Sequence, residues 1–141
     1  MPNHKLTTKL SICLLLLFSC QAYTQKAPTF VLPGDKQTIN LEKLKGKVVY
    51  LDFWASWCPP CKVSLPLLDK LRQEYLDAGK AFDVLAINVD SDPEDGLDFL
   101  YDSPVAYLSL HDSSGKTPSA YEIIGMPTAF LLDQQGNIRM I

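Results

Sequence analysis

The chain has 141 residues, the usual size of a single domain once a short N-terminal leader is set aside. Hydrophobic residues make up 47% and charged residues 21%, which are ordinary globular values that exclude a disordered chain, a fibrous repeat and a polytopic membrane protein. The formal net charge is −3. Because a negative domain repels phosphate, nucleic-acid binding is not expected.

The first 22 residues have the pattern of a secretory leader. Lys5 and Lys9 precede an apolar run over residues 10–18, and small and polar residues follow it. The run is shorter than the roughly 20 residues that a membrane-spanning helix needs. We therefore expect a periplasmic or cell-envelope protein with a leader over residues 1–22, a tether to about residue 26 and one domain over residues 27–141.

The position of Cys20 is compatible with two ways of cleaving the leader. Residues 17–20 resemble the lipobox of bacterial lipoproteins, in which cleavage falls before a cysteine that then carries acyl chains. Ordinary cleavage after Ala22 would instead discard Cys20. In both cases the membrane is contacted only through the leader or a lipid anchor, and Cys58 and Cys61 are the cysteines left for chemistry.

The hydrophobic pattern of the remaining chain alternates between strand and helix periods, which predicts an α/β sandwich. The expected elements, in chain order, are a hairpin over residues 30–32 and 38–41, a strand over 47–54, a helix over 60–77, a strand over 82–89, a helix from 92 to about 101, a strand over 105–110, a short helix over 119–123, and a closing hairpin over 128–132 and 137–141. Gly79 is the expected end of the long helix.

The most informative segment is Cys58-Pro59-Pro60-Cys61, which lies where an expected buried strand is followed by an expected helix. In that context a C-x-x-C motif indicates redox chemistry. Cys58 lies at the helix N-terminus, where unpaired N–H groups and the helix dipole favour the thiolate, and Pro60 suits the first turn. Cys61 lies one turn further on, positioned to resolve a mixed disulfide. We therefore assign Cys58 as the nucleophile and Cys61 as the resolving cysteine.

A structural, zinc-binding or haem-binding role suits the cysteine pair less well. A purely structural disulfide that closes so short a loop adds only about 2 kcal/mol to the stability of the fold in the entropy model. A structural zinc site needs four ligands, and His111 alone cannot complete one. A c-type haem site needs histidine where Lys62 stands. No bound cofactor and no metal are expected.

Asp52 interrupts an otherwise apolar strand before the cysteines. Burial raises the pKa of a carboxyl group, so this residue can accept a proton near neutral pH. If Asp52 lies beneath Cys61, it is the general base for the resolving thiol. The alternative is a core aspartate satisfied by backbone donors.

Pro127 lies in the segment Gly125-Met126-Pro127-Thr128, between a short helix and a strand. A proline here marks a strand start, a sheet edge or a cis bond in a tight turn. A cis bond would leave the Met126 backbone free to pair with an extended substrate segment. A plain turn proline is the alternative.

The remaining candidates have weaker signals. Trp54 and Trp57 flank the cysteines and could form an apolar rim, although Trp54 equally suits the core. His111 adjoins a turn and is expected on the surface. An acidic cluster is expected to be a solvated helix start; its members are Asp90, Asp92, Glu94 and Asp95.

These motifs together resemble the thioredoxin superfamily, and specifically its exported, membrane-tethered TlpA/ResA-type thiol–disulfide oxidoreductases. The resemblance rests on residues 27–30, 41–47, 53–62 and 125–128. It implies a three-layer thioredoxin fold with an added N-terminal hairpin, a central insertion over about residues 90–121, and a cis bond before Pro127.

The chain also departs from that pattern. Asp52 matches the buried aspartate of thioredoxin, where this subfamily often has asparagine, and the lysine that accompanies it in thioredoxin falls on Ala86. An active-site glutamate of some relatives falls on Ser91, so its role is not carried over. The family continues with a C-terminal helix, which we expect to be missing because the sequence stops at Ile141.

The resemblance implies a reductant of exported protein disulfides, such as those of cytochrome c maturation. Its partners would be protein dithiols or disulfides and a membrane thiol-electron carrier. The alternatives are a copper-binding metallochaperone-type module and a peroxiredoxin-like peroxidase. The expected substrate-contact residues are Trp57, Pro59, Pro60, Met126 and Thr128.

Overall fold

The structure is a computed structural model that describes residues 25–35 and 37–141. The expected leader, Cys20 and most of the tether lie outside the described residues, so export and lipid anchoring stay predictions. Among the residues described, no helix is both long and apolar enough to cross a membrane.

A five-stranded sheet forms the centre of the fold. Its central strand pairs in parallel with one neighbour and antiparallel with the other. In spatial order the strands are β5 (Leu108–His111), β4 (Phe82–Asn88), β3 (Val48–Trp54), β6 (Thr128–Leu132) and β7 (Ile138–Met140). The parallel strands β3 and β4 are almost entirely apolar, as expected for strands that are covered on both faces.

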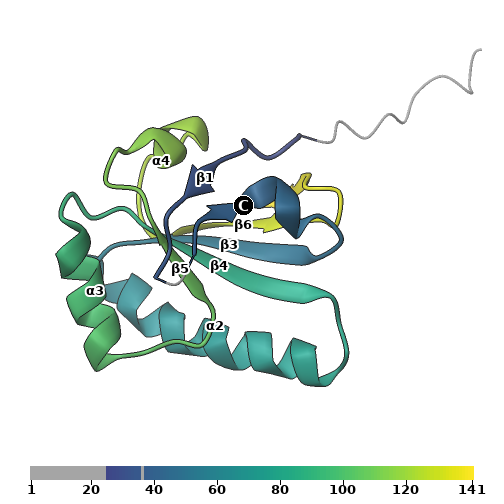
Figure 1. Ribbon diagram of the computed structural model, residues 1–141, viewed down its shortest axis with the longest axis horizontal. Coiled ribbons are helices and arrows are strands. Elements are labelled where there is room, and N and C mark those ends of the chain that lie inside the picture. Colours follow the sequence, from purple (N-terminus) through teal and green to yellow (C-terminus); the bar gives the residue numbers. More distant parts are fainter. Residues whose placement is uncertain (1–24, 36) are drawn as a thin grey trace, which may run out of the picture.

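Two layers cover the sheet, as Figure 1 shows. The long helix α2 (Pro59–Asp77) and α3 (Pro93–Asp102) pack on one face. The other face carries the antiparallel hairpin β1 (Val31–Leu32) and β2 (Ile39–Asn40), the 3-10 helix η1 (Leu41–Leu44) and α4 (Lys116–Ala120). The expected three-layer α/β/α arrangement with an N-terminal hairpin is therefore confirmed.

Alternation along β3 sends its side chains into two separate cores. Val49, Leu51 and Phe53 pack beneath the hairpin. Trp54 lies on the opposite face, in the core beneath α2 that also contains both cysteines. The strand that ends at the cysteine segment is thus held from both sides.

Helix α2 begins one residue before the expected start and ends at the expected residue. Two prolines occupy its first turn, where their missing N–H groups leave no helical bond unmade. Beyond its end, Gly79 has a φ of 67°, and its N–H donates to the carbonyl of Leu76 at 2.9 Å. Gly79 therefore ends the helix as predicted, since a left-handed residue favours glycine.

Two expected elements were misplaced along the chain. Strand β5 begins at Leu108 rather than at residue 105, and the short helix is α4, at Lys116–Ala120 rather than residues 119–123. The helix starts earlier because the Asp112 carboxylate accepts hydrogen bonds from the N–H groups of Ser114 at 3.0 Å and Thr117 at 2.6 Å. Hydrogen bonds from one preceding side chain, rather than apolar spacing, favour this boundary.

Replacing Asp112 by alanine is expected to lower the free energy of unfolding by about 1–2 kcal/mol, because the N–H groups of Ser114 and Thr117 lose their acceptor. Asp112 is only 4% exposed, so the freed N–H groups would not be fully rehydrated. Urea unfolding monitored by circular dichroism measures the change. The control is Ser113→Ala at the exposed neighbouring position. Equal midpoints for the two variants would contradict the assigned role of Asp112.

Candidate active site

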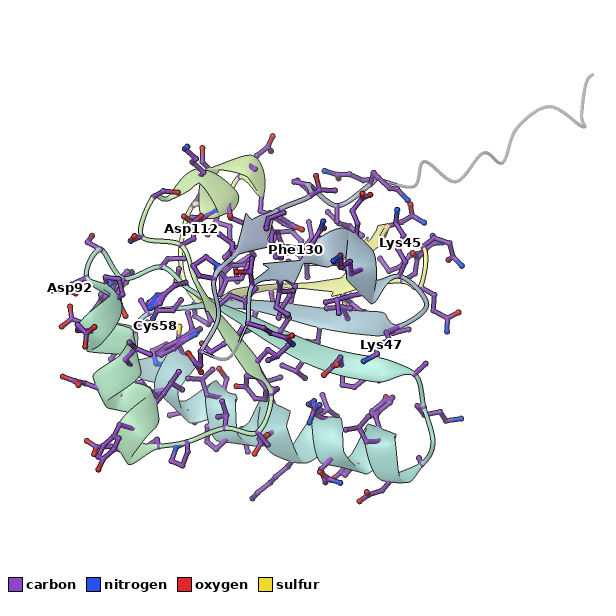
Figure 2. The ribbon with its side chains drawn as sticks, in the orientation of Figure 1. Lys45, Lys47, Cys58, Asp92, Asp112 and Phe130 are labelled. Carbon is purple, nitrogen blue, oxygen red and sulfur yellow. A yellow bond between two sulfur atoms is a disulfide. The ribbon has the colours of Figure 1, made fainter. Side chains whose placement is uncertain are left out.

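Cys58 and Cys61 form a disulfide at the junction of β3 and α2, with their Cα atoms 5.3 Å apart. Figure 2 shows Cys58 at the same end of the molecule as Asp92 and at the opposite end from Lys47. Cys58 is 3% exposed and Cys61 is fully buried. The fold therefore places the two bonded sulfur atoms just beyond the carboxyl end of the central strand β3.

The start of α2 provides an electrostatic setting for the sulfur of Cys58. Cys58 is the N-cap residue, and Pro59 and Pro60 fill the first turn. Within the described part of the chain, no side chain caps this end of the helix. After reduction, the positive end of the dipole and the N–H group of Cys61 in the first turn favour a thiolate over a thiol on Cys58.

The surface beside the disulfide is partly apolar. Trp57 is 66% exposed, and Pro59 and Pro60 are also exposed. Trp54 is fully buried, and its ring centroid lies 5.6 Å from that of Phe99. Of the two tryptophans, Trp57 alone therefore lies on the rim, and Trp54 belongs to the core.

The Met126–Pro127 peptide bond is cis, as predicted. Pro127 is exposed, while Met126 packs against the core cluster that contains both cysteines. The Thr128 hydroxyl donates to the carbonyl of Gly125 at 2.7 Å and closes the loop. The loop and the disulfide thus share one end of the molecule, although 65 residues of sequence separate Cys61 from Met126.

Asp52 lies on the face of β3 that α2 covers and is 3% exposed. Its Oδ2 atom is buried without a hydrogen-bond partner among the described residues. Burial raises the pKa of the Asp52 carboxyl from 3.8 to about 7. Its neighbour on β4 is Ala86, so that strand supplies no cation opposite it. This environment disfavours the alternative of a core aspartate satisfied by backbone donors.

A cavity of about 340 Å³ lies beside Asp52 and extends to the cis-proline loop, and neither cysteine lines it. Its lining includes Ser64 on α2 and Pro127 in the cis-proline loop. The Ser64 hydroxyl donates to the backbone carbonyl of Cys61 at 2.9 Å, one turn back along the helix. The cavity therefore reaches α2 one turn beyond Cys61, without reaching its sulfur atom.

The expectation that Asp90 is solvated was wrong. Asp90 is 2% exposed, and its carboxylate accepts hydrogen bonds from the Ser56 N–H and hydroxyl and from the Asn88 side chain. Asp92 behaves as expected, since it is exposed and caps α3 by accepting from the Glu94 N–H at 3.1 Å. Asp90 could have been singled out because it follows the carboxyl end of the buried strand β4. The parallel strand β3 ends at the same side of the sheet and leads to the cysteines.

His111 was also placed wrongly. It ends β5 and is half-buried, and its Nδ1 atom is buried without a partner in the described part of the chain. Residues 25–35 and 37–141 contain no group of three or more His, Cys, Asp or Glu side chains arranged to hold a metal ion.

Comparisons with known proteins identify the family. The family model described as Redoxin matches residues 22–141. The chain belongs to the Redoxin family. It is 33% identical over 107 residues to the thiol-disulfide oxidoreductase ResA of Oceanobacillus iheyensis, covering 76% of this chain and 55% of that protein. It is 32% identical over 120 residues to the thioredoxin-like protein YneN of Bacillus subtilis, covering 83% of this chain and 69% of the relative.

Solved structures agree on the fold of this Redoxin-family chain. A putative thiol:disulfide interchange protein DsbE from Chlorobium tepidum superposes with a TM-score of 0.79 at 40% identity, covering 83% of this chain and 82% of that one. The predicted thioredoxin-like fold and the resemblance to ResA/TlpA-like proteins are confirmed. The chain spans little more than half the length of the Oceanobacillus relative.

Proposed function

We propose that this protein is a thiol–disulfide oxidoreductase that reduces disulfides in exported proteins through Cys58 and Cys61. The observation that carries the proposal is the disulfide at the start of α2, beside the cis Met126–Pro127 loop. The names of the ResA and DsbE relatives support the same activity. No cofactor is needed, because the two thiols themselves store the two electrons.

The cycle starts from the reduced protein. The Cys58 thiolate attacks one sulfur of a substrate disulfide, forming a mixed disulfide and releasing the first substrate thiolate. Cys61 then loses its proton and attacks the Cys58 sulfur, which releases the second substrate thiolate and forms the Cys58–Cys61 disulfide. Two electrons pass to the substrate. An external dithiol must return two electrons before the next cycle.

Asp52 is the proposed base for the second step. The buried Cys61 thiol needs a proton acceptor, and a carboxylate with a pKa of about 7 is half ionised near neutral pH. The cavity that Asp52 shares with Ser64 and Pro127 would give the carboxylate a way to exchange its proton with solvent.

Substrate recognition is assigned to the exposed surface around the disulfide. An extended substrate segment would pair with the Met126 backbone, with Pro127 and Thr128 completing the loop. Trp57 and the two prolines of the motif, Pro59 and Pro60, would contact apolar side chains next to the substrate cysteine.

Replacing Trp57 by alanine is expected to reduce kcat/KM for a protein disulfide by about tenfold, as for an exposed aromatic anchor of an interface. The reduction of a small disulfide such as oxidised glutathione should change less than twofold, because that substrate is too small to cover the exposed face of Trp57. The matched control is Tyr101→Ala, which removes another exposed aromatic side chain, from α3. Equal losses on both substrates would contradict a role in protein recognition.

The proposed physiological setting is the cell envelope. The leader directs the chain there, Cys20 supplies a lipid anchor, and a membrane thiol-electron carrier returns electrons to the disulfide. Disulfide-bonded apocytochrome c is the proposed class of substrate.

A single-turnover experiment tests this setting. Reduced protein is mixed with an apocytochrome c peptide that contains its C-x-x-C-H disulfide. We expect two peptide thiols to form for each Cys58–Cys61 disulfide. Thiols that form only at the uncatalysed rate would exclude this substrate class.

A further inference from the structure

A buried carboxylate lies directly behind the turn that leads to Cys58. The Ser56 N–H donates to both oxygens of Asp90, at 3.2 and 3.0 Å, and the Ser56 hydroxyl donates to Oδ1 at 3.1 Å. Ser56 stands two residues before Cys58. In the same turn, the Cys58 N–H donates to the carbonyl of Ala55 at 3.1 Å. Asp90 therefore binds the segment whose conformation places the Cys58 sulfur.

A second set of contacts holds Asp90 in place. The Asn88 side chain donates to Asp90 Oδ2 at 2.7 Å, and its oxygen accepts from the Asp90 N–H at 3.2 Å. Helix α3 packs on the Asn88 amide at Gly96, where an added Cβ would lie 2.6 Å from the amide nitrogen. Glycine at this position thus allows α3 to press the amide against Asp90. The chain of contacts runs from α3 through β4 to the active-site turn.

The charge of Asp90 has no ionic partner among the described residues. The ion pairs found in residues 25–35 and 37–141 involve Glu42, Asp83 and Asp133 as the acids. Lys62, which follows Cys61 on α2, lies over the Phe99 ring, with its Nζ 4.9 Å from the ring centroid. All side-chain donors to Asp90 are neutral groups, which orient toward the charge without cancelling it.

We propose that Asp90 is a positioning residue of the redox site, which holds the Ser56–Cys58 turn and whose negative charge makes the Cys58 thiolate less stable. This inference rests on the proposed thiol–disulfide function. For two like charges roughly 10 Å apart at an effective dielectric constant of about 20, repulsion raises the pKa of a thiol by about one unit. A less stable thiolate disfavours the reduced form and thereby makes the couple more reducing.

The Asp90→Asn variant tests both parts of the role, because asparagine keeps the shape and removes the charge. We expect the pKa of Cys58 to fall by about one unit, measured on the reduced protein from the pH dependence of its alkylation rate. At a pH where Cys58 is ionised in both proteins, we also expect a tenfold shift of the glutathione equilibrium toward the reduced protein, equal to about 30 mV. The control is Asp95→Asn, which removes an exposed carboxylate from the first turn of α3 and should shift neither quantity.

Ser56→Ala distinguishes the charge from mere loosening of the turn. It deletes the hydroxyl donor but keeps the Ser56 N–H bonds and the Asp90 charge. The less compensated charge should raise the pKa of Cys58, opposite in direction to Asp90→Asn. If Asp90→Asn does not fold, the Ser56→Ala result decides alone.

Shifts of the same sign in both variants, or no shift in either, would overturn the role of Asp90. The wild-type protein separates this inference from the proposed function. If the wild type has no reversible couple, the proposed function itself fails. If the wild type titrates normally and Asp90→Asn matches it, only the inference about Asp90 fails.

Discussion

Cys58→Ser is expected to lose all disulfide reductase activity, a decrease of at least about a thousandfold, because a serine hydroxyl is not ionised near neutral pH and cannot attack sulfur. Cys61→Ser is expected to be inactive in turnover but to accumulate a mixed disulfide between Cys58 and the substrate. The difference follows from the start of α2, where Cys58 has the N-cap position and Cys61 is fully buried. Mass spectrometry of each variant after mixing with a protein disulfide measures the adduct.

The double variant Cys58→Ser/Cys61→Ser is the matched control and should form no adduct. It also reports whether loss of both sulfur atoms alters the fold, through its circular dichroism spectrum. An adduct that forms on Cys61 in the Cys58→Ser variant, and not on Cys58, would contradict the assignment of nucleophile and resolving cysteine.

Asp52→Asn is expected to make the protein more stable at alkaline pH, by up to about 4 kcal/mol at pH 8. The pKa of Asp52 is about 7 in the folded state, against 3.8 in the unfolded chain, because burial disfavours its charge. Between these values the folded state binds the proton and the unfolded state does not. The stability of the wild type therefore falls as the pH rises from about 4 to about 7.

The variant lacks this loss, so its advantage over the wild type should be small at pH 4 and largest at pH 8. Urea unfolding across this range measures the difference. Asp98→Asn, on the exposed part of α3, is the control and should give a difference that does not change with pH. A constant difference for Asp52→Asn would show that the carboxyl group is not buried in the way described.

The elements around the cysteines could be predicted because their signals are local. The apolar run of β3, the prolines at the start of α2 and Gly79 at its end each act within a few residues. Boundaries set by side chains were missed. Strand β5 begins late and α4 begins early, and in the latter case the Asp112 carboxylate starts the helix through hydrogen bonds that apolar spacing does not reveal.

The site was predictable to the extent that its residues are close in sequence. The motif was sufficient to identify Cys58 and Cys61, and the resemblance to a family was needed for the isomer at Pro127. Asp90 was misjudged because the acidic residues that follow it suggest a solvated helix start. Its burial depends on Ser56, which is 34 residues away, and on the packing of Gly96 against Asn88. Predicting these contacts would require knowing how the strands are aligned in the folded sheet, which the sequence alone does not give.

The most direct test is to equilibrate the protein with reduced and oxidised glutathione and measure the fraction of the Cys58–Cys61 disulfide. A reversible two-electron couple between the dithiol and the disulfide is predicted, with a potential of about −270 mV, as for a thioredoxin-like reductant. A value near about −120 mV would instead describe an oxidant and contradict the proposed direction of electron flow. If the two cysteines did not interconvert reversibly between dithiol and disulfide, the proposed thiol–disulfide exchange would be wrong.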